Sequence, residues 1–172
     1  MRHTTRKLQL TTRAPLDYTN KRMSGLTSKH LESFGQKHCE NFLGVFSCDI
    51  HPEINGKKVF SVIFNESTHD EDGSHFVCIY AREKTLYYFD SLGLKCENKY
   101  ILQFINLCNR KIVETNIQIQ SYDSIFCGYF CLSFILFMCL NISYNKYFNF
   151  FSKTNLTLND KIVVHLIIKL LD

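Results

Sequence analysis

The sequence of 172 residues has no tryptophan, no Cys-x-x-Cys pair and no apolar run as long as a membrane span. Structural zinc sites usually combine closely spaced pairs of cysteine and histidine, so the spacing of the eight cysteines predicts no metal ion. Residues 1–18 include several basic side chains but no apolar run of signal-peptide length. We therefore expect a protein that is not secreted, with reduced thiols rather than a disulfide framework.

The most apolar stretch is "SIFCGYFCLSFILFMCL", residues Ser124–Leu140. Its apolar part, Ile125–Leu140, includes Gly128 and Ser133 and is shorter than the roughly 20 residues that a membrane span needs. The stretch therefore predicts a buried core helix and no membrane association.

The composition is that of one globular domain, with 45% hydrophobic and 21% charged residues. A net charge of +4 is a mild basic excess, compatible with contact with nucleic acid but too small to establish it. Residues 1–26 are basic and have no clear apolar period, which predicts a flexible N-terminal extension before a domain of residues 27–172. At this boundary, Thr27 or Ser28 is suited to cap a short helix.

The remaining pattern predicts an α+β domain, a small mixed sheet flanked by helices. Segments rich in β-branched and aromatic residues predict strands. These predicted strands are Val59–Asn65, His75–Ala81, Thr85–Ser91 and Asn116–Tyr122. Apolar residues at helical spacing predict helices over Asn98–Lys111 and Thr157–Asp172, the second capped by Asn159 or Thr157.

Three separated residues have the chemistry of a cysteine nucleophile, its base and the group that orients the base. Cys127 stands at the start of the apolar helix, where the positive end of the helix favours a thiolate. His75 begins one predicted strand and Asp90 ends the next, so an antiparallel pair would place both at the same edge of the sheet.

Other residues of the same segments have different expected roles. Gln120, seven residues before Cys127, is able to offer an amide N–H to a developing oxyanion, together with the Cys127 backbone N–H. Cys131 and Cys139 lie deeper in the helix and are expected to behave as small hydrophobic side chains.

Each of these signals is weak when taken alone. A single histidine is more often a surface residue, Asp90–Gly93 would serve simply as a turn, and an isolated Cys127 would more often be core. The combination is more informative, because the order of the residues, their spacing and their positions at element ends agree.

The segments "NESTHDEDGSHFVCIYAREKTLYYFDSLGL", "QSYDSIFCGYFC" and "NFLGVFSCDIHP" resemble the adenovirus-type cysteine proteases (adenain) and their relatives in DNA viruses and virus-derived mobile elements. The resemblance covers about residues 28–140. It implies a papain-like or ubiquitin-like-protease core with the nucleophile at the N-terminus of a buried helix. Cys127 would be the nucleophile, His75 the general base and Asp90 the third triad member, with Gln120 and the Cys127 N–H forming the oxyanion hole.

The sequence departs from the family pattern at two positions. Phe76 stands where the family usually has Trp, and Asp90 replaces the Glu of adenoviral enzymes, although ubiquitin-like-protein proteases of the same clan use Asp. Neither departure removes a reacting group.

The resemblance also implies a function: a thiol protease of virion maturation that cleaves viral capsid and core precursors at Gly-containing sites, in the virion and the host cell. It implies two activating cofactors, DNA and a capsid-derived peptide. The peptide adds a strand to the sheet and is tethered through a cysteine of the protease, and Cys108 lies near the position of that tether. "MSGL" (Met23–Leu26) resembles the family's cleavage context, which suggests self-processing between Leu26 and Thr27. The alternative is an uncut basic extension that binds nucleic acid or directs nuclear entry.

Two rival functions stay open. One is a protease or isopeptidase for ubiquitin-like modifiers, a deubiquitinase or deSUMOylase, because those modifiers end in Gly-Gly. The other is a catalytically inactive binding module with the same fold.

Overall fold

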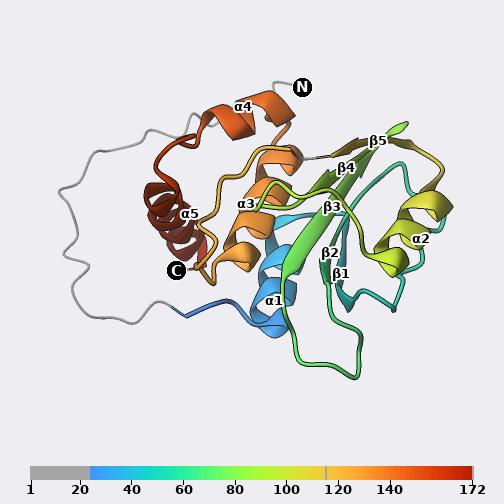
Figure 1. Cartoon of the computed structure of the whole chain (residues 1–172). Coiled ribbons are helices and arrows are strands. Elements are labelled where there is room, and N and C mark those ends of the chain that lie inside the picture. The colour runs from blue at the N-terminus through green and yellow to red at the C-terminus, as the bar shows by residue number, and fades with distance from the viewer. Residues whose placement is uncertain (1–23, 115, 172) are drawn as a thin grey trace, which may run out of the picture.

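The computed structural model describes residues 24–114 and 116–171, and its centre is a five-stranded sheet with helices on both faces (Figure 1). In the order in which they lie in the sheet, the strands are β1 (Phe42–Ser47), β2 (Val59–Asn65), β3 (Phe76–Arg82), β4 (Thr85–Phe89) and β5 (Lys111–Glu114). The two outer pairs are parallel and the two inner pairs antiparallel. The predicted α+β class with a mixed sheet flanked by helices is confirmed.

The helices are divided between the two faces of the sheet (Figure 1). Four of them contribute to the apolar core on one face: α1 (Ser28–His38), α3 (Cys127–Cys139), α4 (Tyr144–Asn149) and α5 (Leu156–Leu171). The fifth helix, α2 (Lys99–Cys108), covers the other face. Strand β3 therefore buries side chains on both faces, and such strands read in the sequence as continuous apolar runs.

Helix α3 is the buried helix that the apolar stretch predicts. It lies against β3 and begins at Cys127. A Cβ atom at Gly128 would lie 3.1 Å from Leu31 Cδ2, so the glycine allows the first turn of α3 to approach α1 closely. None of the helices within the described residues is long and apolar enough to cross a membrane.

The start of α1 agrees with the predicted cap. The Thr27 side chain accepts the His30 backbone N–H, which satisfies a donor that the first helical turn leaves free. The predicted basic extension lies mostly outside the described residues, which begin at Ser24.

The predicted strand over 116–122 is wrong, because this segment has no regular secondary structure. Its alternation of polar and apolar residues has another cause. Ile119 is buried, and the Ile119 and Gln120 N–H groups both donate to the Ser91 carbonyl rather than to a neighbouring strand. An extended segment held against a turn therefore shows the same period as a strand.

Two helix ends also differ from prediction. Helix α2 stops at Cys108 because Asn109 adopts a left-handed conformation with φ 48°, and the chain then enters β5, which the sequence did not predict as a strand. Helix α5 begins at Leu156, and Asn155 accepts the Leu158 N–H at 3.0 Å, so neither Thr157 nor Asn159 is the cap.

Candidate active site

The first turn of α3 presents Cys127 to the site. Cys127 is the first residue of the helix and is 9% exposed, and the preceding Phe126 makes no side-chain hydrogen bond to the helix start. The positive end of the helix dipole therefore acts at the thiol without a capping side chain.

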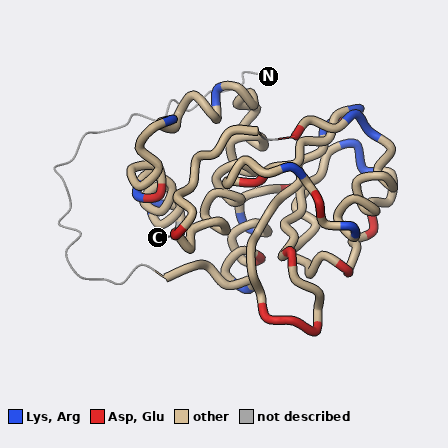
Figure 2. Tube along the Cα trace, viewed as in Figure 1, with Lys and Arg blue, Asp and Glu red and all other residues tan. Residues whose placement is uncertain are grey.

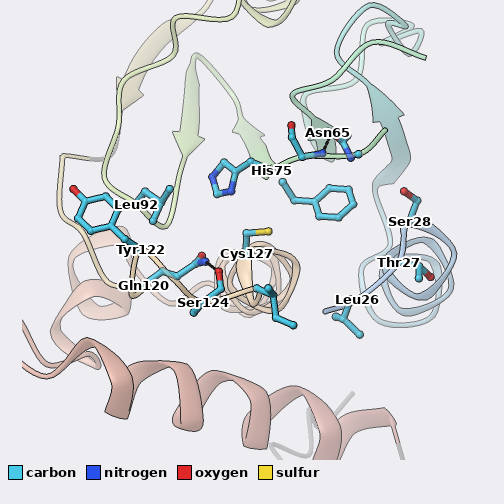
Figure 3. A pocket seen from close by; sticks show the side chains of 14 residues that line it. Leu26, Thr27, Ser28, Asn65, His75, Leu92, Gln120, Tyr122, Ser124 and Cys127 are labelled. Atoms are coloured by element: carbon cyan, nitrogen blue, oxygen red, sulfur yellow. Dashed lines mark hydrogen bonds between the residues drawn. The ribbon is translucent and has the colours of Figure 1, made fainter. Parts of the chain in front are cut away.

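The antiparallel pairing of β3 with β4 brings His75 and Asp90 together. His75 precedes β3, Asp90 follows β4, and the His75 Nε2 donates to Asp90 Oδ1 at 2.8 Å. Asp90 is 2% exposed and also accepts the Leu92 N–H, so its carboxylate is fixed. Because Nε2 is occupied by Asp90, Nδ1 is the ring nitrogen left for the Cys127 thiol, which lies beside the imidazole in Figure 3.

The charges around His75 favour a protonated ring. Burial alone would lower the pKa of His75, but hydrogen bonding and charge attraction from Asp90 and Cys127 raise it from 6.5 to about 10. A cation beside a thiol, at the start of a helix, is the arrangement that activates cysteine nucleophiles. By contrast, burial raises the pKa of the Cys131 thiol well above its ordinary value, which keeps that thiol protonated.

Gln120 enters the site from the irregular segment before α3. Its side chain is 2% exposed and lines the same cleft as Cys127 and His75 (Figure 3). The Gln120 Nε2 donates to the Ser124 carbonyl at 2.9 Å, and its Oε1 accepts from the Ser91 hydroxyl at 2.6 Å. The amide is therefore held at both ends.

The cleft that contains these groups has a volume of about 540 Å³. One side is formed by Leu26 and Thr27, immediately before α1, and the Ser24 carbonyl accepts a hydrogen bond from the Tyr129 hydroxyl at 3.3 Å. Figure 3 shows Leu26 near the first turn of α3. The described start of the chain is thus one wall of the cleft.

The structure places the predicted site residues in two separate regions. His75, Asp90, Gln120 and Cys127 come together at one edge of the sheet. Cys108 does not join them, because it is the last residue of α2 and packs against the core on the opposite face. Burial raises the pKa of Cys108 to about 11.

Two residues of α5, for which the sequence predicted no role at the site, hold the segment carrying Gln120. The Asn159 side chain is fully buried, and its Nδ2 donates to the Ile119 carbonyl at 3.0 Å. Asp160 Oδ1 accepts the Ser121 N–H at 3.5 Å. Local pattern offered no signal for these contacts, because Asn159 and Ile119 are 40 positions apart.

The thiols and acidic groups show no metal site or disulfide. All eight cysteines are free thiols. Across residues 24–114 and 116–171, no group of three or more His, Cys, Asp or Glu side chains is placed to hold a metal ion.

No protein-family model and no curated protein matches this sequence. Among solved structures, the chain is similar to the crystal structure of the selenomethionine form of the ASFV pS273R protease, with 18% sequence identity and a TM-score of 0.49. The match covers 83% of this chain and 68% of that chain. At this level the similarity says nothing of the role of any residue.

Proposed function

We propose that the protein is a cysteine endopeptidase with Cys127 as nucleophile, His75 as general acid and base, and Asp90 as the group that orients His75. The observation that carries the proposal is the hydrogen bond of 2.8 Å between the buried Asp90 carboxylate and the His75 imidazole. His75 lines the same cleft as the Cys127 thiol at the start of α3. Nucleophile, base and orienting group are the parts that such catalysis requires.

In the proposed reaction, Cys127 Sγ attacks the scissile carbonyl carbon, and the carbonyl oxygen becomes an oxyanion. The Cys127 backbone N–H and the Gln120 Nε2–H donate to this oxyanion. His75 then gives its proton to the leaving amine, the C–N bond breaks and a thioester remains. His75 accepts a proton from water, whose oxygen attacks the thioester, and release of the acid restores the thiolate and the protonated ring.

We place the substrates among viral structural precursors cleaved near glycine, which rests on the sequence resemblance. The lining of the cleft supports a peptide with an apolar side chain close to the cut. Tyr122 and Ile125 line the cleft and are 74% and 57% exposed, so they offer apolar surface to a bound chain.

A direct test combines turnover with thiol labelling. Wild type should cleave peptides of the form apolar-x-Gly-x, and Cys127→Ala and His75→Ala should not. A chloroacetamide probe followed by peptide mapping should label Cys127 first. Cys139 needs its own control, Cys139→Ala, because hydrogen bonding from Cys39 and the charge of Arg82 lower the pKa of Cys139.

The same assay separates the rival functions. Cleavage of ubiquitin-like modifier conjugates without cleavage of precursor peptides would identify an isopeptidase. Absence of both turnover and selective Cys127 labelling would identify a binding module, and would overturn the proposal.

Self-processing between Leu26 and Thr27 is part of the proposal, supported by the place of both residues in the lining of the cleft. Wild type and Cys127→Ala are incubated side by side and their N-termini sequenced. A new terminus at Thr27 in wild type alone is the expected result. An intact terminus in wild type that is cleaving peptides would refute self-processing.

The proposed DNA cofactor would bind a group of neighbouring cations that we call the basic end, Lys57, Lys58, Lys84, Arg110 and Lys111. Figure 2 shows Lys and Arg gathered near β5. Hydrogen bonds join its parts: the Lys111 N–H donates to the Lys84 carbonyl, and the Arg110 guanidinium donates to the Lys58 carbonyl at 2.8 Å. The basic end lies where β3 and β4 meet in their turn, at the opposite end of these strands from His75 and Asp90.

The peptide cofactor and its tether at Cys108 also stay predictions. They are tested by adding a cysteine-containing peptide, which should activate wild type and should not activate Cys108→Ala.

A further inference from the structure

We propose that Ser91 is a positioning residue that fixes the Gln120 amide for oxyanion stabilisation. This inference rests on the proposed peptidase function. It concerns a residue that touches neither substrate nor nucleophile and acts through Gln120.

Ser91 is bound to the Gln120 segment by three hydrogen bonds. Its side chain is fully buried, and its Oγ donates to Gln120 Oε1 at 2.6 Å. Its carbonyl accepts the backbone N–H groups of Ile119 and Gln120 at 2.9 and 3.0 Å. Turn and segment therefore form one unit, although Ser91 and Gln120 are 29 positions apart.

The orientation of the amide follows from the chemistry of its partners. The Ser124 carbonyl can only accept, so it must face the Gln120 Nε2. A flipped amide would set Oε1 against the Ser124 carbonyl oxygen and lose the bond. With Oε1 held by the Ser91 hydroxyl, one Nε2–H bonds Ser124 and the second is left for the cleft that Gln120 lines with Cys127.

Ser91 also couples the two halves of the site through the chain itself. Asp90, the residue directly before Ser91, holds His75, while Ser91 holds Gln120. A single turn after β4 thus sets the base and the oxyanion donor relative to each other. Preorganised donors of this kind avoid reorganisation during the reaction.

The first experiment compares Ser91→Ala with Ser133→Ala. Ser133 is a matched control, because it is also a fully buried serine whose Oγ makes its hydrogen bonds away from the cleft, to the Phe130 carbonyl at 2.9 Å and with the Tyr147 hydroxyl at 2.8 Å. We expect kcat to fall about 10-fold in Ser91→Ala, with KM within about twofold of wild type, because the interaction is made to a group used in the transition state. Ser133→Ala should keep the wild-type kcat.

The second experiment asks whether the effect passes through Gln120. Gln120→Ala should lower kcat about 10²- to 10³-fold, as loss of one oxyanion donor does. Adding Ser91→Ala to Gln120→Ala should cause no further loss, because the group that Ser91 orients is gone. Alkylation of Cys127 by iodoacetamide forms no oxyanion, so its rate should be the same in wild type and Ser91→Ala.

The outcomes distinguish the two levels of the proposal. The role of Ser91 is tested only where wild type is active and Gln120→Ala is impaired. In that case, a kcat of Ser91→Ala equal to that of Ser133→Ala would refute the role. A fall in kcat from Ser91→Ala that adds fully to the fall from Gln120→Ala would refute it as well. If wild type has neither turnover nor selective labelling of Cys127, the peptidase proposal itself fails. Should Ser91→Ala not fold, Ser91→Cys keeps a side chain of similar shape with a weak donor, and the same fall in kcat is expected.

Discussion

Replacing Asp90 with Asn removes one negative charge from the site and nearly no volume. The isosteric amide oxygen still accepts the Leu92 N–H, which Asp90 now holds at 2.8 Å. The change therefore tests the charge beside His75 while the turn after β4 keeps its hydrogen bond.

The structure sets the size of the expected effect. The rise of the His75 pKa from 6.5 to about 10 corresponds to a net of roughly 5 kcal/mol, which remains after burial has opposed the stabilisation of the charged ring by Asp90 and Cys127. Loss of one charged neighbour commonly moves such a pKa by about 1 to 3 pH units. In wild type, the alkaline limb of kcat/KM should lie near pH 10, and in Asp90→Asn it should move down by that amount, with kcat reduced about 10²- to 10⁴-fold.

The assay is kcat/KM for a peptide substrate between about pH 5 and 11, bracketing the ordinary and the raised pKa of histidine. A matched control is Asp49→Asn, because Asp49 forms a second carboxylate–imidazole pair with the exposed His69, with Oδ2 and Nδ1 2.6 Å apart. This control should leave the pH profile unchanged. An unmoved alkaline limb in Asp90→Asn, with activity within a few fold of wild type, would refute the assignment of Asp90.

The raised pKa of His75 also predicts how the stability of the protein depends on pH. The pKa of His75 is raised on folding, so its contribution is fully present below pH 6.5 and is lost as the pH rises toward about 10. The free energy of unfolding of wild type should fall across that window. The fall should be shallower in Asp90→Asn, as measured by urea unfolding at several pH values.

Three further outcomes are expected. Cys131 should stay unlabelled under conditions that fully alkylate Cys127, because burial keeps its thiol protonated; mass mapping that finds Cys131 labelled equally would contradict the site. Gly128→Ala should lower the free energy of unfolding by about 1 kcal/mol in urea, since its new methyl group would lie 3.1 Å from Leu31 Cδ2 of α1, and an unchanged or raised midpoint would show that this side chain moves aside freely. Changing Lys84 and Lys111 to Ala should weaken binding to duplex DNA and lower the slope of log K against log salt by about one for each phosphate that is no longer neutralised, whereas an unaltered slope would remove the basic end from the DNA proposal.

The elements that the sequence predicted well are those whose pattern is local. The run Val59–Asn65 matches β2, and Thr27 caps α1, because strand composition and capping depend on neighbouring residues. The pairing of His75 with Asp90 was also open to prediction, because the ends of adjacent antiparallel strands meet at one edge.

What the sequence could not reveal depends on distant partners. Segment 116–122 alternates like a strand, but its hydrogen bonds go to Ser91 and to Asn159 of α5. Ser91 looks like an ordinary turn residue, since its chemistry appears only where it meets Gln120. Local pattern records which residues are buried or capped, not which distant segment accepts their hydrogen bonds.

The buried amide of Asn159 has a consequence for any shortened form of the protein. A chain that stopped after α3 would retain every reacting group proposed here, from His75 to Cys127. It would lose the donor to the Ile119 carbonyl, and with it one support of the segment that presents Gln120. The competent unit therefore extends at least through the first turns of α5. In a deletion series from the C-terminus, turnover should be lost in chains that still contain Cys127.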